Sequence, residues 1–145
     1  MRELPTLTVA REYVGGLSDV SKMPGRSTST SAFDCKTGSK LALIPGSVCF
    51  NCYARKGNYT RYPAVRKALD RRLAALDRPD WVPMMSRAIG KDPFFRWHDS
   101  GDLQGVKHLD MIVEVARLTP GTQHWLPTRE IGFVRRWEKL HGAFP

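Results

Sequence analysis

Residues 94–102 of this chain read FFRWHDSGD, an aromatic run followed by a polar turn. A short aromatic segment that ends in Asp, Ser and Gly is typical of a strand and the turn after it. Because successive side chains on a strand point to opposite faces, we expect Phe94, Arg96 and His98 to share one face. The two aromatic residues between them are expected on the other face.

A helix, a strand and a second helix are expected after this turn. Apolar side chains recur at helical spacing in residues 104–118, and Pro120 with Gly121 ends the pattern. Residues 122–127 have the composition of a strand, and residues 131–140 predict a final helix. The chain from residue 94 onward therefore predicts strand, helix, strand, helix.

Two further helices are expected before this segment. Pro63 suits the first turn of a helix. The apolar residues after it recur at spacings of four, four and three, and they are Val65, Leu69, Leu73 and Leu76. This stripe predicts a helix over residues 63–76. Residues 81–89 predict a second, shorter helix that ends at Gly90.

The beginning of the chain is less regular. Residues 25–33 are rich in Ser and Thr and predict a strand, whereas residues 34–62 predict a long loop that carries all the cysteines. Residues 1–23 are expected to be an N-terminal lead-in, with residues 7–10 as a short strand. Residues 24–145 are then expected to form a single α/β domain.

The order strand, loop, helix, strand, helix, strand, helix predicts an α/β fold with a parallel sheet and right-handed crossovers. We expect a partial (β/α) barrel or a small open parallel sheet with a long cysteine-bearing loop. A closed eight-stranded barrel takes about 200 residues or more, and this chain has 145. A sheet this small leaves edges and one face poorly covered, so we expect a homo-oligomer or a partner protein that completes the barrel.

The cysteines are Cys35, Cys49 and Cys52, the last two in a C-x-x-C pair. Such a pair binds one metal centre from a single turn, and Cys35 adds a third thiolate. Three thiolates leave one position open on a four-iron cluster, or one ligand missing from a tetrahedral zinc site. The histidines that are candidates to complete a zinc site are His98, His108, His124 and His141. Reduced structural cysteines are the remaining alternative.

The expected compartment is the cytoplasm. No apolar run approaches the roughly 18 residues of a membrane span, and the N-terminus lacks the charged-then-apolar pattern of a signal peptide. Thiols stay reduced in the cytoplasm, where clustered cysteines are more often metal ligands than disulfides. This compartment therefore favours a metal site, and no membrane partner is expected.

Polar side chains follow each predicted strand. Cys35 comes after the first strand, residues 99–102 after the second and residues 128–130 after the third. Parallel strand–helix folds place their functional groups at this end of the sheet, so we expect a pocket there that Arg96 and His98 help to line. Simpler roles exist too: His98 suits a hydrogen-bonded core position, and the aspartates suit turns or helix N-caps.

The formal net charge is +9, from 23 Lys and Arg against 14 Asp and Glu. Such a balance favours an anionic partner such as nucleic acid or a nucleotide. The alternative is that the charge serves only to keep the protein soluble. Basic residues follow the cysteine loop closely, interleaved with tyrosines that can stack on bases. Those expected to contact nucleic acid are Arg55, Lys56, Arg66, Lys67, Arg71 and Arg72. A solvated helix face is the alternative.

Several of these motifs together resemble one protein family. They are residues 22–25 (KMPG), Cys35, residues 49–57 (CFNCYARKG) and residues 95–102 (FRWHDSGD). In this order they are similar to the phage family known as gene product 88. The resemblance spans residues 23–129, which is most of the chain.

The layout of that family in turn resembles the radical S-adenosylmethionine enzymes. This resemblance implies that the three cysteines hold a [4Fe-4S] cluster and that the methionine moiety of S-adenosylmethionine occupies the open iron. Gly101 and Asp102 match the element that receives the amino group of that cofactor, since a carboxylate accepts a charge-assisted hydrogen bond from an ammonium. His98 and Ser100 are expected to line the same pocket.

The resemblance implies a phage iron–sulfur protein in the cytoplasm of the host, with residues 24–145 as its iron–sulfur-binding domain. If it is an enzyme, the expected reaction is reductive cleavage of S-adenosylmethionine to start a radical reaction on a nucleotide or nucleic acid. The alternative is a phage protein without enzymatic activity that binds nucleic acid or inhibits the host, with a structural Cys3His zinc site.

Overall fold

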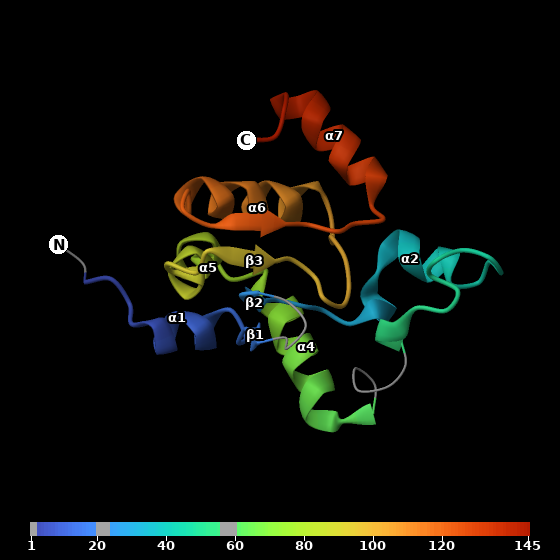
Figure 1. Ribbon diagram of the computed structural model, residues 1–145, viewed down its shortest axis with the longest axis horizontal. Coiled ribbons are helices and arrows are strands. Elements are labelled where there is room, and N and C mark those ends of the chain that lie inside the picture. The colour runs from blue at the N-terminus through green and yellow to red at the C-terminus, as the bar shows by residue number, and fades with distance from the viewer. Residues whose placement is uncertain (1–2, 20–23, 56–60) are drawn as a thin grey trace.

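The structure is a computed structural model that describes residues 3–19, 24–55 and 61–145. Within these residues the strands form one four-stranded sheet in the order β1, β2, β3, β4 (Figure 1). The strands are β1 (Ser18–Asp19), β2 (Arg26–Ser27), β3 (Phe94–Arg96) and β4 (Gln123–Trp125). The β1–β2 pair is antiparallel, whereas the β2–β3 and β3–β4 pairs are parallel.

The small open sheet expected from the sequence is confirmed, with one correction. β1 pairs antiparallel with β2, so the sheet is mixed rather than purely parallel. Only residues 20–25 separate these two strands, and a parallel pair needs a crossover of about a dozen residues or more. Among the described strands β1 and β4 are the edges, and the sheet does not close into a barrel.

Helices make up much of the remaining chain. The α-helices are α1 (Leu7–Tyr13), α2 (Lys36–Leu41), α4 (Pro63–Ala75), α5 (Trp81–Ile89), α6 (Val106–Leu118) and α7 (Ile131–His141), and short 3-10 helices span Ala32–Asp34 and Tyr53–Arg55. The predicted helices from residue 63 onward are confirmed as α4, α5, α6 and α7. None of the described helices is long and apolar enough to cross a membrane.

Three expectations for the beginning of the chain are wrong. Residues 7–10 lie in α1 rather than in a strand, because the Thr6 hydroxyl accepts a hydrogen bond from the Val9 N–H (3.2 Å) and caps the helix. In the segment 25–33, only Arg26–Ser27 is a strand. The expected irregular loop after it contains α2 and a turn of 3-10 helix.

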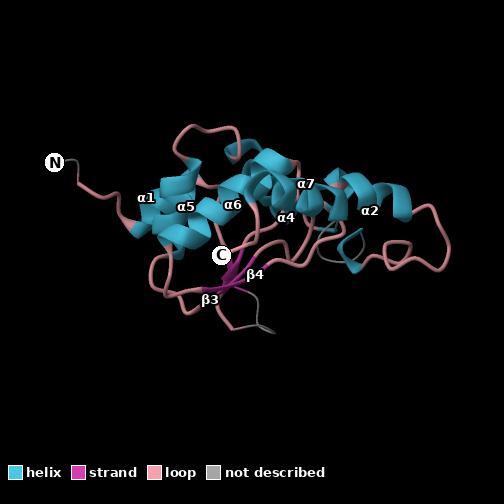
Figure 2. Cartoon of the chain, turned by 90° about the horizontal axis from the view of Figure 1, so that it is seen from above, coloured by secondary structure: helices cyan, strands magenta, loops and turns pink. Residues whose placement is uncertain are grey.

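The helices lie on one side of the strands, as Figure 2 shows. On that side Phe95 and Trp97 are buried, and Trp97 packs against Trp81 of α5 with ring centroids 6.1 Å apart. Trp97 Nε1 also donates a hydrogen bond to His124 Nδ1 (3.1 Å). Phe94, which is 40% exposed, lies on the other face. The predicted alternation therefore holds up to Trp97.

His98 departs from this alternation. Its φ of 62° lies in the left-handed region, which turns the chain at the end of β3. Its ring meets the ring of His108 in α6, with centroids 5.4 Å apart, and both side chains are buried. His98 therefore packs towards the helix layer instead of sharing a face with Arg96 along a regular strand.

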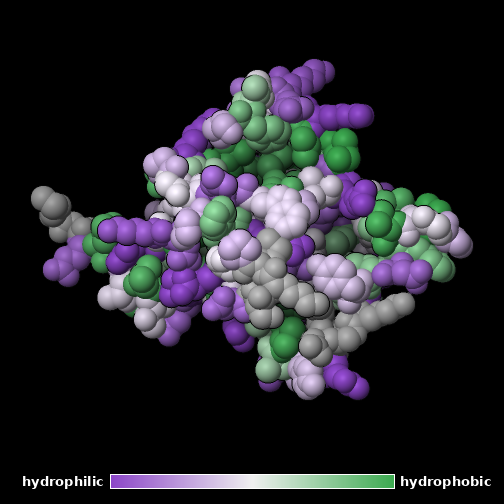
Figure 3. All heavy atoms as spheres, in the orientation of Figure 1, coloured by the Kyte–Doolittle hydropathy of each residue, from purple (hydrophilic) through white to green (hydrophobic). Residues whose placement is uncertain are grey.

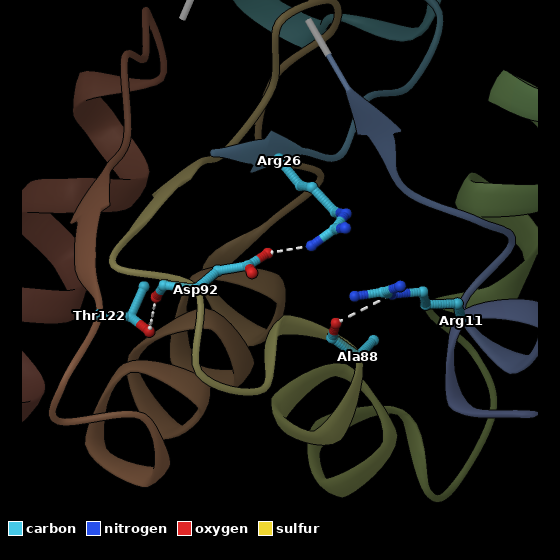
Figure 4. Close-up of polar contacts among 5 residues, drawn as sticks. All are labelled: Arg11, Arg26, Ala88, Asp92 and Thr122. Carbon is cyan, nitrogen blue, oxygen red and sulfur yellow. Dashed lines mark hydrogen bonds and ion pairs between the residues drawn. The ribbon is translucent and has the colours of Figure 1, made fainter. Parts of the chain in front are cut away.

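The first helix packs against the hydrophobic core. Ala10 and Val14 are buried in the same hydrophobic cluster as Trp97. Arg11 Nε donates to the carbonyl oxygen of Ala88 in α5 (3.2 Å), as Figure 4 shows. α1 thus packs with α5 and with the core around Trp97.

Asp92 joins the amino ends of the parallel strands (Figure 4). Its carboxylate forms an ion pair with Arg26 Nη1 of β2 (2.6 Å), and its carbonyl accepts a hydrogen bond from the Thr122 hydroxyl (2.6 Å) just before β4. The Gln123 N–H donates to the carbonyl of Pro93 (2.8 Å). These contacts fix one end of the sheet and leave the opposite, carboxyl end to the loops that carry the polar motifs.

The two buried histidines make stability depend on pH. Burial lowers the pKa of His98 to about 4. Burial, followed by the neighbouring His98, lowers the pKa of His108 to about 3. An unfolded histidine has a pKa near 6.5, so below that pH the unfolded state binds protons that the folded state does not accept until about pH 4. The free energy of unfolding therefore falls as the pH drops from about 6.5 to about 4.

We expect His108→Gln to reduce this loss of stability by about 2 kcal/mol between about pH 7 and pH 4.5, because one titrating group is removed from the core. Urea unfolding at the two pH values measures it. His141→Gln, at a partly exposed histidine near the C-terminus, is the matched control and should behave as the wild type does. An unchanged pH dependence in His108→Gln would contradict this account.

Candidate functional site

A cavity of about 380 Å³ lies at the carboxyl end of the parallel strands. In Figure 1 the arrows of β3 and β4 point towards the side where α2 and the cysteine-bearing segment lie. The cavity is lined by Cys35, Cys49 and Cys52, by the turn 98–102 after β3, and by residues 127–129 after β4. The structure thus brings together cysteines and strand ends that the sequence placed at one edge of the sheet.

The cysteines lie in residues 32–55, a segment of α2, two turns of 3-10 helix and the turns between them. We call this segment the cysteine arm. Cys35 is the residue immediately before α2, and Cys52 immediately precedes a turn of 3-10 helix. The Ser47 hydroxyl accepts from the Phe50 N–H (3.2 Å), which shapes the turn between α2 and the C-x-x-C pair. All three cysteines are free and half-buried.

Gly38 leaves space between two of the thiols. A Cβ on Gly38 would lie 3.1 Å from Cys35 Cβ and 3.6 Å from the Sγ atoms of both Cys35 and Cys49. Both sulfurs therefore border the small volume that the missing side chain leaves open. Sequence analysis missed this role, and the only signal was a glycine three residues after Cys35 in a stretch that is otherwise compatible with a helix.

Glu130 fixes the cysteine arm to the end of β4. Its carboxylate accepts from the Thr37 N–H (2.6 Å) and from the Thr37 hydroxyl (2.7 Å), two residues after Cys35. The Glu130 side chain is buried at 3% exposure. A buried carboxylate needs such donors, so this contact sets where α2 begins. The sequence placed Glu130 at a strand end but gave no sign of its partner.

Two further contacts attach the arm to the turn after β3 and to itself. The Tyr53 hydroxyl donates to the carbonyl oxygen of Asp99. Arg55 donates to the Ser39 hydroxyl (2.8 Å), and its guanidinium lies 4.8 Å from the centroid of the Phe33 ring. Arg55, predicted to contact nucleic acid, is thus engaged within the arm.

Asp102 joins the ends of β3 and β4. Its carboxylate accepts from the Leu103 N–H (2.7 Å), from the Arg129 N–H (2.7 Å) and from the Thr128 hydroxyl. A carboxylate offers about four acceptor positions, so most of this one is used by the protein itself. Asp102 lines the cavity as expected, but its hydrogen bonds go to the backbone and to Thr128.

Buried polar atoms at the cavity have no partner within the described residues. They include His98 Nδ1 and the Ser100 hydroxyl oxygen on residues that line the cavity, and the Thr30 hydroxyl oxygen lies behind the turn, next to Gly101. Buried polar groups are nearly always hydrogen-bonded, so these atoms are suited to a polar ligand or water. Gly101 follows with φ 83°, and a Cβ there would lie 2.0 Å from Thr30 Oγ1. Gly101 therefore allows the turn to pack against the Thr30 backbone.

The histidines differ in their access to the cysteines. Of the four, all of which the structure describes, only His98 lines the cysteine cavity. His124 uses both ring nitrogens, with Trp97 Nε1 at 3.1 Å and the Thr119 hydroxyl at 2.7 Å. His108 Nδ1 accepts from the Gln104 N–H (3.1 Å).

The described residues contain no group of three or more His, Cys, Asp or Glu side chains that converges to hold one metal ion. A single tetrahedral zinc with Zn–S bonds of about 2.3 Å requires sulfurs roughly 3.8 Å apart. A four-iron cluster has a different requirement, because each thiolate binds a separate iron. The three thiols border one cavity.

The pKa of the Cys35 thiol is raised to about 12, mainly by burial and also by the charges of Asp102, Cys52 and Cys49, whereas Arg55 acts in the opposite direction. Without a bound cation Cys35 is therefore a neutral thiol at physiological pH. A metal centre that needs the thiolate must displace this proton, so its binding depends on pH.

The predicted basic surface is only partly present. Arg72 is buried, and its guanidinium donates to the carbonyl of Gly16 and the hydroxyl of Ser29. This correction follows from helix geometry, because Arg72 lies on the face of α4 that meets the body of the protein. Arg66, Lys67 and Arg71 are exposed. Lys56, like Lys22 and Met23 of the family motif, lies outside the described residues.

The exposed apolar side chains of the arm form a second surface feature. Those on its outer turns are Leu43, Ile44, Val48 and Phe50, with exposures from 43% to 81%. Figure 3 shows green, hydrophobic side chains gathered over the part of the molecule that carries α2. Large exposed apolar groups that lie together are typical of contact surfaces.

The fold and this cavity define an α/β protein with a cysteine-lined pocket at the carboxyl end of a small sheet. A family model described as Gene product 88 matches residues 11–143. The chain therefore belongs to the gene product 88 family, which confirms the resemblance to that phage family. No curated protein and no solved structure matches the chain.

In the metal-free protein we expect Cys35 to react with iodoacetamide much more slowly than a cysteine in an unstructured peptide at about pH 8.5, because only the thiolate reacts. Its rate should keep rising beyond about pH 10, where an ordinary thiol is already ionised. Peptide mapping by mass spectrometry after timed alkylation measures the rate at each cysteine. A Cys35 rate that levels off near pH 9 would show that the thiol is not perturbed.

Proposed function

We propose that this chain is a phage iron–sulfur protein that holds a [4Fe-4S] cluster through Cys35, Cys49 and Cys52 and acts in the host cytoplasm. The observation that carries the proposal is that three free thiols border one cavity of about 380 Å³ at the strand ends. Three thiolates bind three irons and leave the fourth open.

The space around the thiols supports a cluster in particular. Gly38 keeps open the volume beside two sulfurs. Tyr53, Arg55 and Glu130 fix the arm from different directions. These contacts hold the three cysteines at the border of one cavity.

We propose that a small polar cofactor binds beside the cluster, with S-adenosylmethionine as the first candidate. The cluster, when bound, would supply an electron and one open coordination position for the reductive cleavage of S-adenosylmethionine. His98 and Ser100 line this cavity, and His98 Nδ1 and Ser100 Oγ are buried polar atoms without a partner in the described part of the chain, so they are potential hydrogen-bonding groups. Gly101 and Asp102 shape the turn, and Asp102 retains at most a minor share of its carboxylate for the cofactor.

The proposed substrate is a nucleotide or nucleic acid. The net charge of +9 supports an anionic substrate, and Arg66, Lys67 and Arg71 are exposed along α4. A second subunit or a partner protein is also proposed, and the exposed apolar side chains of the arm support it.

We expect the anaerobically reconstituted protein to bind about four irons with equivalent sulfide. Cys35→Ala, Cys49→Ala and Cys52→Ala should each lose most of this iron, because each removes the ligand of one iron. Iron, sulfide and zinc analyses together with the visible absorption spectrum measure it. Stoichiometric zinc without iron would instead support the alternative, a structural Cys3His site completed by His98 in a protein without this chemistry.

Gly38→Ala tests the space between the thiols. The added methyl would lie 3.1 Å from Cys35 Cβ and 3.6 Å from two sulfurs, so we expect iron occupancy to fall severalfold. The fold should persist, because alanine favours a helix over glycine by about 1 kcal/mol. Gly132→Ala in α7, where nothing lies within 4 Å, is the matched control. Equal iron content in both variants would remove the proposed role of Gly38.

A further inference from the structure

The face of the sheet opposite the helices carries exposed aromatic side chains. Trp125 of β4 is 51% exposed and Phe94 of β3 is 40% exposed, and Gln123 of β4 is the register partner of Phe94. A cavity of about 230 Å³ is lined by these three residues together with Pro24, Phe95, Arg96 and His124. Figure 2 shows the labelled helices on the other side of these strands.

Arg96 places a cation in this aromatic surface. It is the register partner of Trp125, and its guanidinium lies 4.7 Å from the centroid of the Trp125 ring. Such a stacked arginine contributes a cation–π contact and keeps its charge. Arg96 also lines the cysteine cavity, and so does the exposed Arg129, four residues after Trp125. The aromatic surface is therefore continuous with the strand ends.

We propose that this face binds a single-stranded nucleic acid, with bases stacked on Trp125 and Phe94 and phosphates near Arg96 and Arg129. Aromatic side chains stack on bases of any sequence, and arginines neutralise the backbone. The charge of the whole chain, +9, favours a polyanion on an exposed surface. Bases in a duplex are already stacked and are not available to Trp125.

This binding does not require a cluster, so it is tested separately from the proposed function. It assigns the nucleic acid to the sheet rather than to α4. Arg96 borders both cavities. A single-stranded nucleic acid bound on the sheet would therefore extend towards the cysteines.

The position of Trp125 gives a direct readout. The other tryptophans, Trp81, Trp97 and Trp137, are at most 3% exposed. Stacking of a base on Trp125 should therefore quench the exposed component of the tryptophan fluorescence. The probe is a fluorescein-labelled oligothymidylate of about 12 nucleotides at low salt, with its anisotropy as a second measurement and an unlabelled duplex as competitor.

We expect the oligothymidylate to quench the fluorescence of the wild type and Trp125→Ala to weaken its binding about tenfold, which is within the range for loss of one stacked base. Trp125→Phe should keep most of the affinity without the quenching. Leu118→Ala, at a residue 57% exposed at the end of α6, is the control and should bind as the wild type does. Binding should also weaken with salt.

Three results would overturn the proposal. One is oligothymidylate binding that is unaffected by Trp125→Ala and lost when Arg66, Lys67 and Arg71 are changed to Gln, which would place the contact on α4. Another is the absence of binding and quenching at low salt. The third is a dimer in sedimentation that Trp125→Ala dissociates, which would assign this face to a second copy of the chain.

Discussion

Two buried carboxylates at the carboxyl end of the sheet hold the rest of the site in place. Asp102 accepts hydrogen bonds from Thr128 and from the Arg129 N–H, so it joins the ends of β3 and β4. Glu130, which follows Arg129 in the chain, accepts two hydrogen bonds from Thr37 at the start of α2. Buried carboxylates are costly without donors, which makes these contacts mutually dependent. Through these contacts, the positions of the strand ends determine where Cys35 lies.

The sequence predicted the regular parts of the fold because their signals are local. The apolar stripe after Pro63 and the glycine at position 90 delimit α4 and α5, and the aromatic run gives β3. The failures have local causes as well. A short apolar run at 7–10 suits strand or helix, and the Thr6 cap decides for the helix. The positive φ of His98 ends the strand alternation, which composition does not reveal.

That the cysteines and the strand ends lie at one cavity was predictable from the sequence, but the contacts around that cavity were not. The cysteines and the turn after β3 meet in one cavity as strand-end reasoning indicates. The roles of Gly38, Glu130 and Arg72 depend on residues far away in sequence, such as Cys49, Thr37 and Ser29. Periodicity and spacing carry no information on such pairs, so a buried arginine on α4 looked like part of an exposed basic face.

The central claim is that the cysteine cavity holds a four-iron cluster with one open iron. Electron paramagnetic resonance of the reduced, anaerobically reconstituted protein, with and without S-adenosylmethionine, tests it most directly. The account predicts the signal of a reduced [4Fe-4S] cluster that changes shape when the ligand is added, since the ligand binds the iron that no cysteine holds. The absence of any cluster signal from protein that retains three reduced cysteines would contradict the claim.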